Sequence, residues 1–158
     1  MGNKMTYHFY GWKAAKDLRA AGADRAAYPE IRTPPDLYDA LSDIWCRDTC
    51  APRMRERWSQ DNRTLGQCSV TAFLAQDIFG GEVYGLITGS GDLHCYNVVN
   101  GVVFDLTSEQ FGEDAANLVY DRERLQHRES PAHFLKSEKR ARYEYLRREL
   151  CSARKTQK

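Results

Sequence analysis

A cysteine, a histidine and an aspartate follow one another along this chain in an order that suits thiol chemistry. Cys68 stands at the start of an apolar stretch with helical character, and His94 and Asp105 follow on a predicted pair of strands. A thiol with a pKa near ~8.5 is mostly protonated at neutral pH, but a helix N-terminus and a neighbouring imidazolium both stabilise the thiolate. A carboxylate that holds one ring nitrogen of the histidine leaves the other free to exchange protons with sulfur. These residue types predict a nucleophile, its base and the group that orients the base.

An acyl intermediate on Cys68 would also need hydrogen-bond donors for its oxyanion. The backbone N–H of Cys68 at the helix start is one such donor. The side-chain amides of Gln67 and Asn62 are the other two that we expect to help.

The clearest β-hairpin signal of the chain lies in residues 93–106. Asn100-Gly101 supplies the positive φ angles of a two-residue type I′ turn. With this pair at the tip, His94 lies diagonally across from Asp105, about 7–8 Å away between backbones and within side-chain reach. Cys95 and Asn97 then point to the opposite face of the sheet. We therefore expect the Cys68 side of the helix to pack on the face that carries His94.

The helix that carries the cysteine is predicted over residues 67–79. Apolar side chains surround it almost completely, with Gln76 and Asp77 as the main exceptions, so we expect it to be buried. Cys68 shares one face with small alanines that would let another element approach closely. Gly80-Gly81 ends the helix.

The remaining elements are expected to flank this centre. An amphipathic helix is predicted over residues 36–46, a strand over 82–88, and a last helix over 130–151. Residues 47–63 are predicted to be loop with about one helical turn, and the stretch after Gly112 to be irregular. We divide the chain into an N-terminal helical extension (1–33, with a helix over 12–21), a core domain (34–151) and a frayed basic tail (152–158). The fold class is α+β, with a buried helix on a small antiparallel sheet.

Composition narrows the classes of function. The chain of 158 residues fits one domain, and its formal charge of +1 gives no general attraction for nucleic acid. Five cysteines without regular spacing favour a reducing compartment, and no apolar run is long enough for a membrane span. We expect a cytoplasmic protein with no nucleic-acid or membrane partner. The basic last helix fits this expectation, because Glu138, Glu144 and Glu149 interleave with its arginines.

Plainer interpretations of the same residues remain open. A cysteine in an apolar helix is often a small buried hydrophobe, and Asp105 could simply brace the hairpin. Cys46 and Cys50 stand four residues apart and could together face a zinc ion, but a site needs further ligands. We expect no metal and no cofactor.

Four motifs follow one another along the chain: Gly66-Gln67-Cys68-Ser69-Val70-Thr71-Ala72, Gln76-Asp77-Ile78-Phe79-Gly80-Gly81-Glu82, His94-Cys95-Tyr96-Asn97 and Asp105-Leu106-Thr107-Ser108-Glu109-Gln110-Phe111-Gly112. Together they resemble the YunG-like family of small bacterial proteins. The likeness covers roughly residues 34–150 and includes Trp58-Ser59 with Asn62. Cys95 departs from it, since an aromatic residue is expected after the histidine.

The family resembles the papain and transglutaminase superfamily, which implies a papain-like fold and the order Cys, His, Asp. Carried over by position, the catalytic roles fall on Cys68, His94 and Asp105, with Gln67 and Asn62 as polar support. We expect Tyr96 and Trp58 to contact the substrate.

The expected function is a cysteine-dependent hydrolase or acyl transferase. Its substrate would be a peptide, amide or other acyl compound. The bond attacked would be an amide or a thioester, and the reaction would pass through a covalent acyl-enzyme. The alternative is a catalytically inert binding or interaction module on a papain-like fold.

Overall fold

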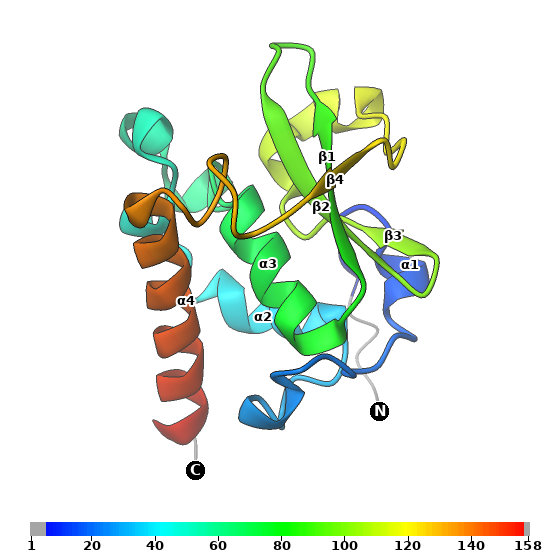
Figure 1. Cartoon of the computed structure of the whole chain (residues 1–158), viewed down its shortest axis with the longest axis vertical. Coiled ribbons are helices and arrows are strands. Elements are labelled where there is room, and N and C mark those ends of the chain that lie inside the picture. The colour runs from blue at the N-terminus through cyan, green and yellow to red at the C-terminus, as the bar shows by residue number, and fades with distance from the viewer. Residues whose placement is uncertain (1–5, 157–158) are drawn as a thin grey trace.

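The computed structural model describes residues 6–156, and these form a mixed α+β fold with one four-stranded antiparallel sheet of order β3-β2-β1-β4 (Figure 1). The helices are α1 (Trp12–Ala15), α2 (Pro34–Ser42), α3 (Cys68–Phe79) and α4 (Ser137–Thr156). The strands are β1 (Glu82–Ile87), β2 (Leu93–Val99), β3 (Val102–Phe104) and β4 (Arg124–Gln126). Short 3₁₀ turns lie at Arg25–Ala27, Arg47–Thr49, Pro52–Arg57, Gln60–Asn62 and Ser108–Asn117.

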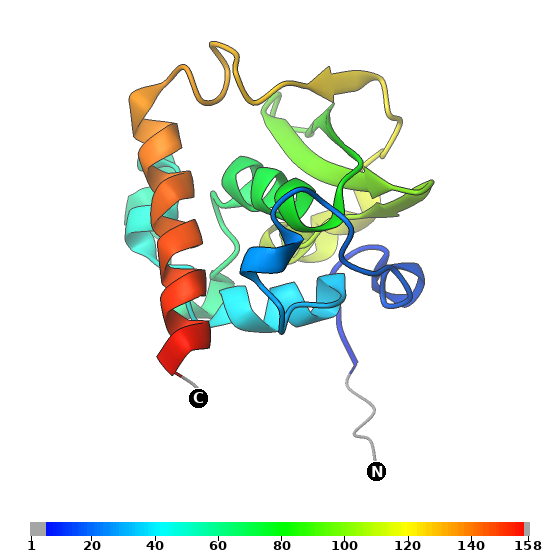
Figure 2. The ribbon, with the colours of Figure 1, turned by 60° about the horizontal axis from the view of Figure 1, so that its bottom comes forward.

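Helix α3 is the centre of the molecule. The sheet lies on one side of it and α4 on the other, as the turned view in Figure 2 shows. Only Cys68, Gln76 and Asp77 among its residues are not fully buried, so the prediction of a buried helix over 67–79 is confirmed. Gly66 precedes it at φ +72°, where a Cβ atom would lie 2.5 Å from the Cys50 sulfur. Only glycine fits this approach to the helix start.

The hairpin has the predicted register over its inner half. Asn97 pairs with Phe104, Val98 with Val103 and Val99 with Val102. Strand β3 ends earlier than expected, because the next backbone N–H, that of Asp105, donates to the carbonyl of Tyr10 at 3.0 Å instead of pairing with β2. The first half of β2 therefore has a strand partner, β1, on one side only.

The predicted packing face of the sheet was wrong. Helix α3 lies on the face of Cys95 and Asn97, and the Asn97 side-chain amide donates to the Ala72 carbonyl at 2.9 Å. His94 belongs by alternation to the other face, with Tyr96. Apolar side chains cover both faces, so alternation along the strand could not decide which one receives the helix. The His94 ring still reaches the cavity at the start of α3, since it lies in the half of β2 that β3 leaves uncovered.

The N-terminal segment is part of the core rather than a separate helical extension. Phe9, Tyr28 and Ile31 are buried with the core residues of α2 and α3. Helix α1 has four residues instead of the expected helix over 12–21, because the following chain turns to cap the end of α3. The N–H of Gly22 donates to the Ile78 carbonyl at 2.8 Å, which satisfies a group that the helix end leaves unpaired.

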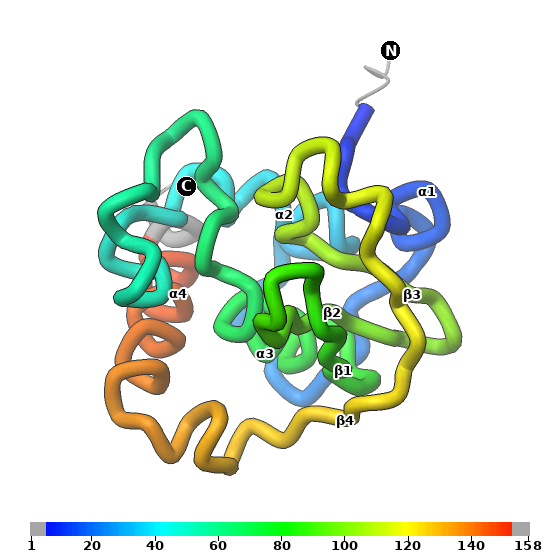
Figure 3. The backbone as a smooth tube through the Cα atoms, turned by 90° about the horizontal axis from the view of Figure 1, so that it is seen from above, coloured from blue at the N-terminus to red at the C-terminus, as the bar shows by residue number. Residues whose placement is uncertain are grey.

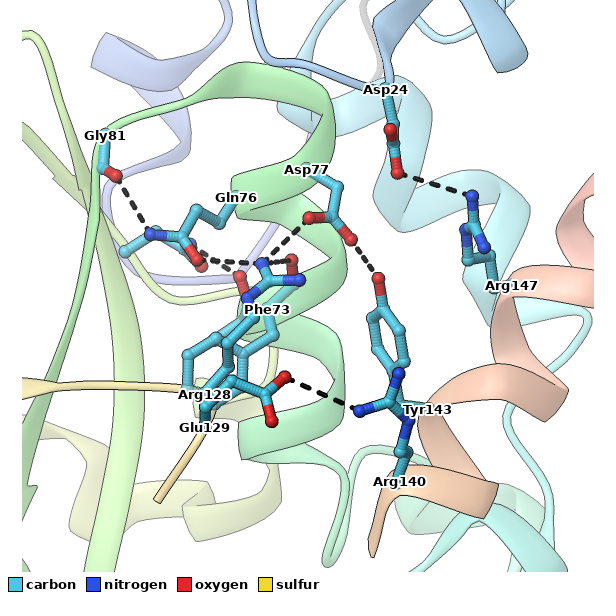
Figure 4. Close-up of polar contacts among 12 residues, drawn as sticks. Asp24, Phe73, Gln76, Asp77, Gly81, Arg128, Glu129, Arg140, Tyr143 and Arg147 are labelled. Carbon is cyan, nitrogen blue, oxygen red and sulfur yellow. Dashed lines mark hydrogen bonds and ion pairs between the residues drawn. The ribbon is translucent and has the colours of Figure 1, made fainter. Parts of the chain in front are cut away.

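Arg128 and Tyr143 join the end of α3 to α4 (Figure 4). Arg128 donates to the Phe73 carbonyl at 3.1 Å and to Gln76 at 2.8 Å, and forms an ion pair with Asp77 at 2.8 Å. The Tyr143 hydroxyl donates to the same Asp77 carboxylate. A cation at a helix C-terminus is favourable, so this cluster stabilises the orientation of α3 at the end opposite Cys68.

The C-terminal helix differs from its prediction at both ends. It begins at Ser137 rather than near residue 130, because the backbone N–H of Phe134 donates back to the Arg128 carbonyl in the connection that runs from β4 to α4 (Figure 3). It continues to Thr156, so the predicted frayed tail is helical over most of its length. The last two residues of that tail lie outside the described part of the chain.

Charged segments hid two elements. Strand β4 lies in the stretch after Gly112 that was predicted to be irregular, and the 3₁₀ turns of Ser108–Asn117 begin just before that stretch and extend into it. The loop predicted over 47–63 contains three short 3₁₀ turns instead of one. Within residues 6–156, we find no helix with an apolar stretch long enough to cross a bilayer.

Candidate functional site

The three residues singled out by their chemistry come from three different elements. Cys68 is the first residue of α3 and is partly exposed, and His94 is the second residue of β2. Asp105 directly follows β3. The His94 Nε2 atom lies 2.6 Å from the Asp105 carboxylate, and both side chains are at most 2% exposed. A charged hydrogen bond that is closed to water is strong, so this pair fixes the histidine ring.

Further donors hold the Asp105 carboxylate. The Thr107 backbone N–H and hydroxyl donate to Oδ1 at 3.1 and 3.3 Å. The Tyr120 hydroxyl donates to Oδ2 at 2.7 Å, and its ring stacks on Tyr10 with 4.1 Å between centroids. Every oxygen of this buried carboxylate therefore has partners, which offsets the cost of keeping its charge out of water.

His94 is held in a protonated state. Burial by itself would lower its pKa, but the charge and hydrogen bond of Asp105, and then those of Cys68, raise the pKa to about 10. The Phe111 ring stands edge-on to the imidazole at 4.8 Å between centroids. Because Nε2 is engaged by Asp105, Nδ1 remains for exchange with the thiol.

The Cys68 thiol has a lowered pKa. The side-chain hydrogen bond from Cys95 lowers it most, burial opposes this, and the hydrogen bond and charge of His94 lower it further. The same bond and burial raise the pKa of Cys95. One sulfur of the pair is thus favoured as thiolate and the other as thiol.

A cavity of about 540 Å³ opens beside Cys68. His94, Cys95, Gln110 and Phe111 form part of its wall together with the turn between β1 and β2 and the first half of α4. Its charged wall residues are Arg53, Asp92, Lys136, Glu138, Lys139 and Arg142. Cys68 therefore forms part of the wall of a cavity whose volume is that of a small-molecule site.

The two expected amide helpers are not part of this cavity wall. Gln67 is fully buried and its side-chain N–H donates to the Cys46 carbonyl at 3.1 Å. Asn62 donates to the Gln110 carbonyl at 3.4 Å. Both amides are used to hold the backbone around the cavity, which leaves backbone N–H groups at the start of α3 as the available donors.

The two expected substrate contacts also lie elsewhere. Tyr96 is 1% exposed, and its hydroxyl accepts a hydrogen bond from the Arg122 backbone at 2.8 Å on the sheet face away from α3. Trp58 donates from its indole to the Arg63 carbonyl at 2.9 Å and does not line the cavity.

The site also contains residues that were not predicted from the sequence. Tyr120 contacts Asp105 from the stretch after Gly112 that was predicted to be irregular, and Phe111 contacts His94 from just before that stretch. His133 reaches the cavity wall from the connection before α4 and Lys139 from the first turn of α4, and the Lys139 amine lies 3.2 Å from the His133 ring. No local pattern marks these contacts, although Phe111 belongs to one of the motifs that carry the family resemblance.

The described residues hold no group of three or more histidines, cysteines or carboxylates suited to a metal ion. Cys50 is buried, and burial raises the pKa of its thiol even though Arg142 and other arginines oppose this. The Cys46 and Cys50 pair therefore has no further ligands within residues 6–156.

Comparisons with known proteins agree with the resemblance. A family model described as YunG protein matches residues 33–155. An "Uncharacterized protein YunG" of Bacillus subtilis (strain 168) is 39% identical over 71 residues, which cover 45% of this chain and 56% of that protein. The match thus spans little more than half of the curated relative's length. No solved structure matches.

Proposed function

This chain belongs to the YunG family, and we propose that it is a cysteine-dependent hydrolase or acyl transferase built on a papain- or transglutaminase-like plan. The observation that carries the proposal is the buried hydrogen bond between His94 and Asp105, beside a partly exposed thiol with a lowered pKa. A cysteine at a helix N-terminus, a histidine on a strand and an aspartate directly after the neighbouring antiparallel strand follow the order Cys, His, Asp that this plan implies.

The first half-reaction forms an acyl-enzyme on Cys68. The thiolate attacks the carbonyl carbon of an amide or thioester, and the oxyanion that develops is stabilised by backbone N–H groups at the start of α3. The bond to the leaving nitrogen or sulfur then breaks, and protonated His94 gives its Nδ1 proton to the leaving group. A thioester to Cys68 remains.

The second half-reaction releases the acyl group. Water or an amine enters the cavity and gives a proton to the now neutral His94 as it attacks the thioester carbon. The bond to sulfur breaks, and Cys68 returns as the thiolate beside a protonated His94. Asp105, held by Thr107 and Tyr120, keeps the ring oriented through both steps.

The direction of the Cys68 pKa shift favours catalysis over simple packing. A cysteine that serves only as a small hydrophobe would have a raised pKa, as Cys50 does. Cys68 has the opposite shift, and it faces a cavity. The rival proposal, an inert binding module, would use the cavity without a reactive sulfur.

Acyl-enzyme formation tests the proposal directly. The whole protein is incubated with S-phenyl thioacetate and with p-nitrophenyl acetate, and its intact mass is measured with time. We expect an acetyl adduct on wild type, loss of that adduct in Cys68→Ala, and a rate lower by about 10²-fold or more in His94→Ala.

Cys151→Ala is the matched control, since Cys151 is a partly exposed thiol on α4 outside the cavity wall. Its adduct should form at the wild-type rate. If wild type acquires no adduct that depends on Cys68, the enzyme proposal fails and the binding module is favoured.

A further inference from the structure

Cys95 forms no covalent bond in the proposed acyl chemistry, yet it lies in the cavity wall next to Cys68. Its side chain is 2% exposed, whereas Cys68 is partly exposed. Both are free cysteines. The cavity wall therefore holds one partly exposed and one buried cysteine.

The packing of α3 on β2 brings the two sulfurs together. Asn97 lies two residues after Cys95 on the same face of the strand, and it bonds to the carbonyl of Ala72, which lies one helical turn after Cys68. Two strand residues advance by about 6.6 Å and one helical turn by about 5.4 Å, so the steps nearly match. Since Asn97 meets Ala72, Cys95 is opposite Cys68, and a side-chain hydrogen bond joins the two thiols.

We propose that Cys95 is the resolving thiol of Cys68, so that a hydroperoxide converts this pair into an intramolecular disulfide. The proposal rests on the reactive Cys68 thiolate of the proposed function and adds a modification site to it. Hydrogen peroxide is the simplest reagent of the class.

The chemistry closes in two steps. The Cys68 thiolate attacks one peroxide oxygen, the O–O bond breaks, and an S–O bond forms; the released hydroxide takes the proton held by His94 and leaves as water. The Cys95 sulfur then attacks the sulfenic sulfur, the S–O bond breaks, and the hydroxyl leaves as a second water with the Cys95 proton. Two thiols are oxidised by two electrons in total, and one hydrogen peroxide is reduced to two waters.

Accessibility sets the order of these steps. Both cysteines line the cavity, but Cys68 is partly exposed and reacts as thiolate, while Cys95 is 2% exposed and is kept as a thiol by its bond to Cys68 and by burial. Formation of the disulfide removes the Cys68 nucleophile but prevents further oxidation of Cys68 to sulfinic acid. An external dithiol can reduce the disulfide again. The pair would act as a reversible stop on the acyl chemistry.

The experiment follows the oxidation state of each cysteine by mass spectrometry. Reduced full-length protein is treated with hydrogen peroxide, denatured in N-ethylmaleimide and digested. We expect wild type to lose one pair of hydrogens and to yield a crosslinked peptide pair containing Cys68 and Cys95, which dithiothreitol separates. In Cys95→Ser we expect oxygen to be added to the Cys68 sulfur instead. After this oxidised variant is treated with dithiothreitol, iodoacetamide should alkylate Cys68 to roughly a tenth or less of the level before oxidation.

Two further measurements separate the possible failures. Cys151→Ser should keep the Cys68–Cys95 crosslink, because Cys151 lies outside the cavity wall. Iodoacetamide alkylation of reduced wild type at pH 6 reports the thiolate alone. Rapid alkylation together with sulfinic acid on wild-type Cys68 would overturn the resolving role only, whereas slow alkylation and no crosslink would overturn both proposals. Because the crosslink is sought in wild type, poor folding of Cys95→Ser leaves the test valid.

Discussion

The chemistry of this site depends on the charge states of Asp105, His94 and Cys68. Asp105 carries its charge among three donors, and this charge is what allows a buried His94 to stay protonated. Protonated His94 in turn favours the Cys68 thiolate. Each step is electrostatic in a region where water is largely excluded, so the effects of single residues should be measurable.

The lowered pKa of Cys68 predicts fast alkylation below neutral pH. With His94 protonated up to about pH 10, the imidazolium is present across the physiological range, and the thiolate persists as the pH falls to the lowered Cys68 value. His94→Gln removes one of the groups that lower this pKa and leaves the Cys95 bond in place. We expect the iodoacetamide rate at pH 6 to fall by about tenfold, because the pKa moves toward ~8.5.

His133→Gln is the matched control for this measurement. His133 lies in the same cavity wall, but burial and then the charge of Lys139 lower its pKa to about 4, so it is neutral at pH 6. Its replacement should leave the pH profile of Cys68 in place. Equal profiles for wild type and His94→Gln would show that the histidine does not support the thiolate.

At the scale of elements, the hairpin between β2 and β3 carries both His94 and Asp105. Its turn needs Asn100 at φ 51° and Gly101 at φ 80°. An L residue with a Cβ atom pays about 1–2 kcal/mol in this region of backbone conformation. No other atom approaches the Cβ position of Gly101, so the cost there is conformational and not steric crowding by the fold.

Gly101→Ala should therefore lower the free energy of unfolding by about 1–2 kcal/mol. Gly89 provides the control, since it is equally open but its φ lies outside the left-handed region. Gly89→Ala should be neutral or slightly stabilising, by up to about 1 kcal/mol. Urea unfolding followed by circular dichroism measures both, and equal effects would contradict a type I′ turn.

Local signals predicted those elements that local physics determines. The apolar circumference of α3, the glycines at its end and the Asn-Gly turn each depend on neighbouring residues, and the structure has all three. The contact of His94 with Asp105 followed from the same register. By contrast, alternation along the strand could not predict the side of the sheet on which α3 packs, because both faces are apolar, one with Cys95 and one with Tyr96.

Long-range partners explain the other differences. Gln67 was expected at the oxyanion, but its amide is taken by Cys46, twenty-one residues earlier in the chain. Tyr120 reaches Asp105 from a charged segment without periodicity. The short α1 results from capping contacts at the distant end of α3. None of these partners can be identified from the few residues that surround them in the sequence.

At the scale of the whole molecule, the N-terminal segment and the sheet form one folded unit. Phe9 packs against Tyr38 of α2 with 5.2 Å between ring centroids, and its side chain is 1% exposed. Its neighbour Tyr10 pairs with Asp105 through the backbone and stacks on Tyr120. The family model begins at residue 33, so this segment precedes the matched region but contributes to the carboxylate's support.

Phe9→Ala is expected to destabilise the whole protein by about 3–5 kcal/mol, because it removes a fully buried aromatic ring and leaves a cavity against α2. Leu135→Ala is the surface control: Leu135 is 64% exposed, and its truncation should change stability by less than about 0.5 kcal/mol. Urea unfolding of both variants, with tryptophan fluorescence and far-ultraviolet circular dichroism as separate probes, measures the effect. A single coincident transition that shifts to lower urea is expected for Phe9→Ala, since the segment and the core unfold together. An unshifted main transition would instead mean that residues 6–33 are an independent extension.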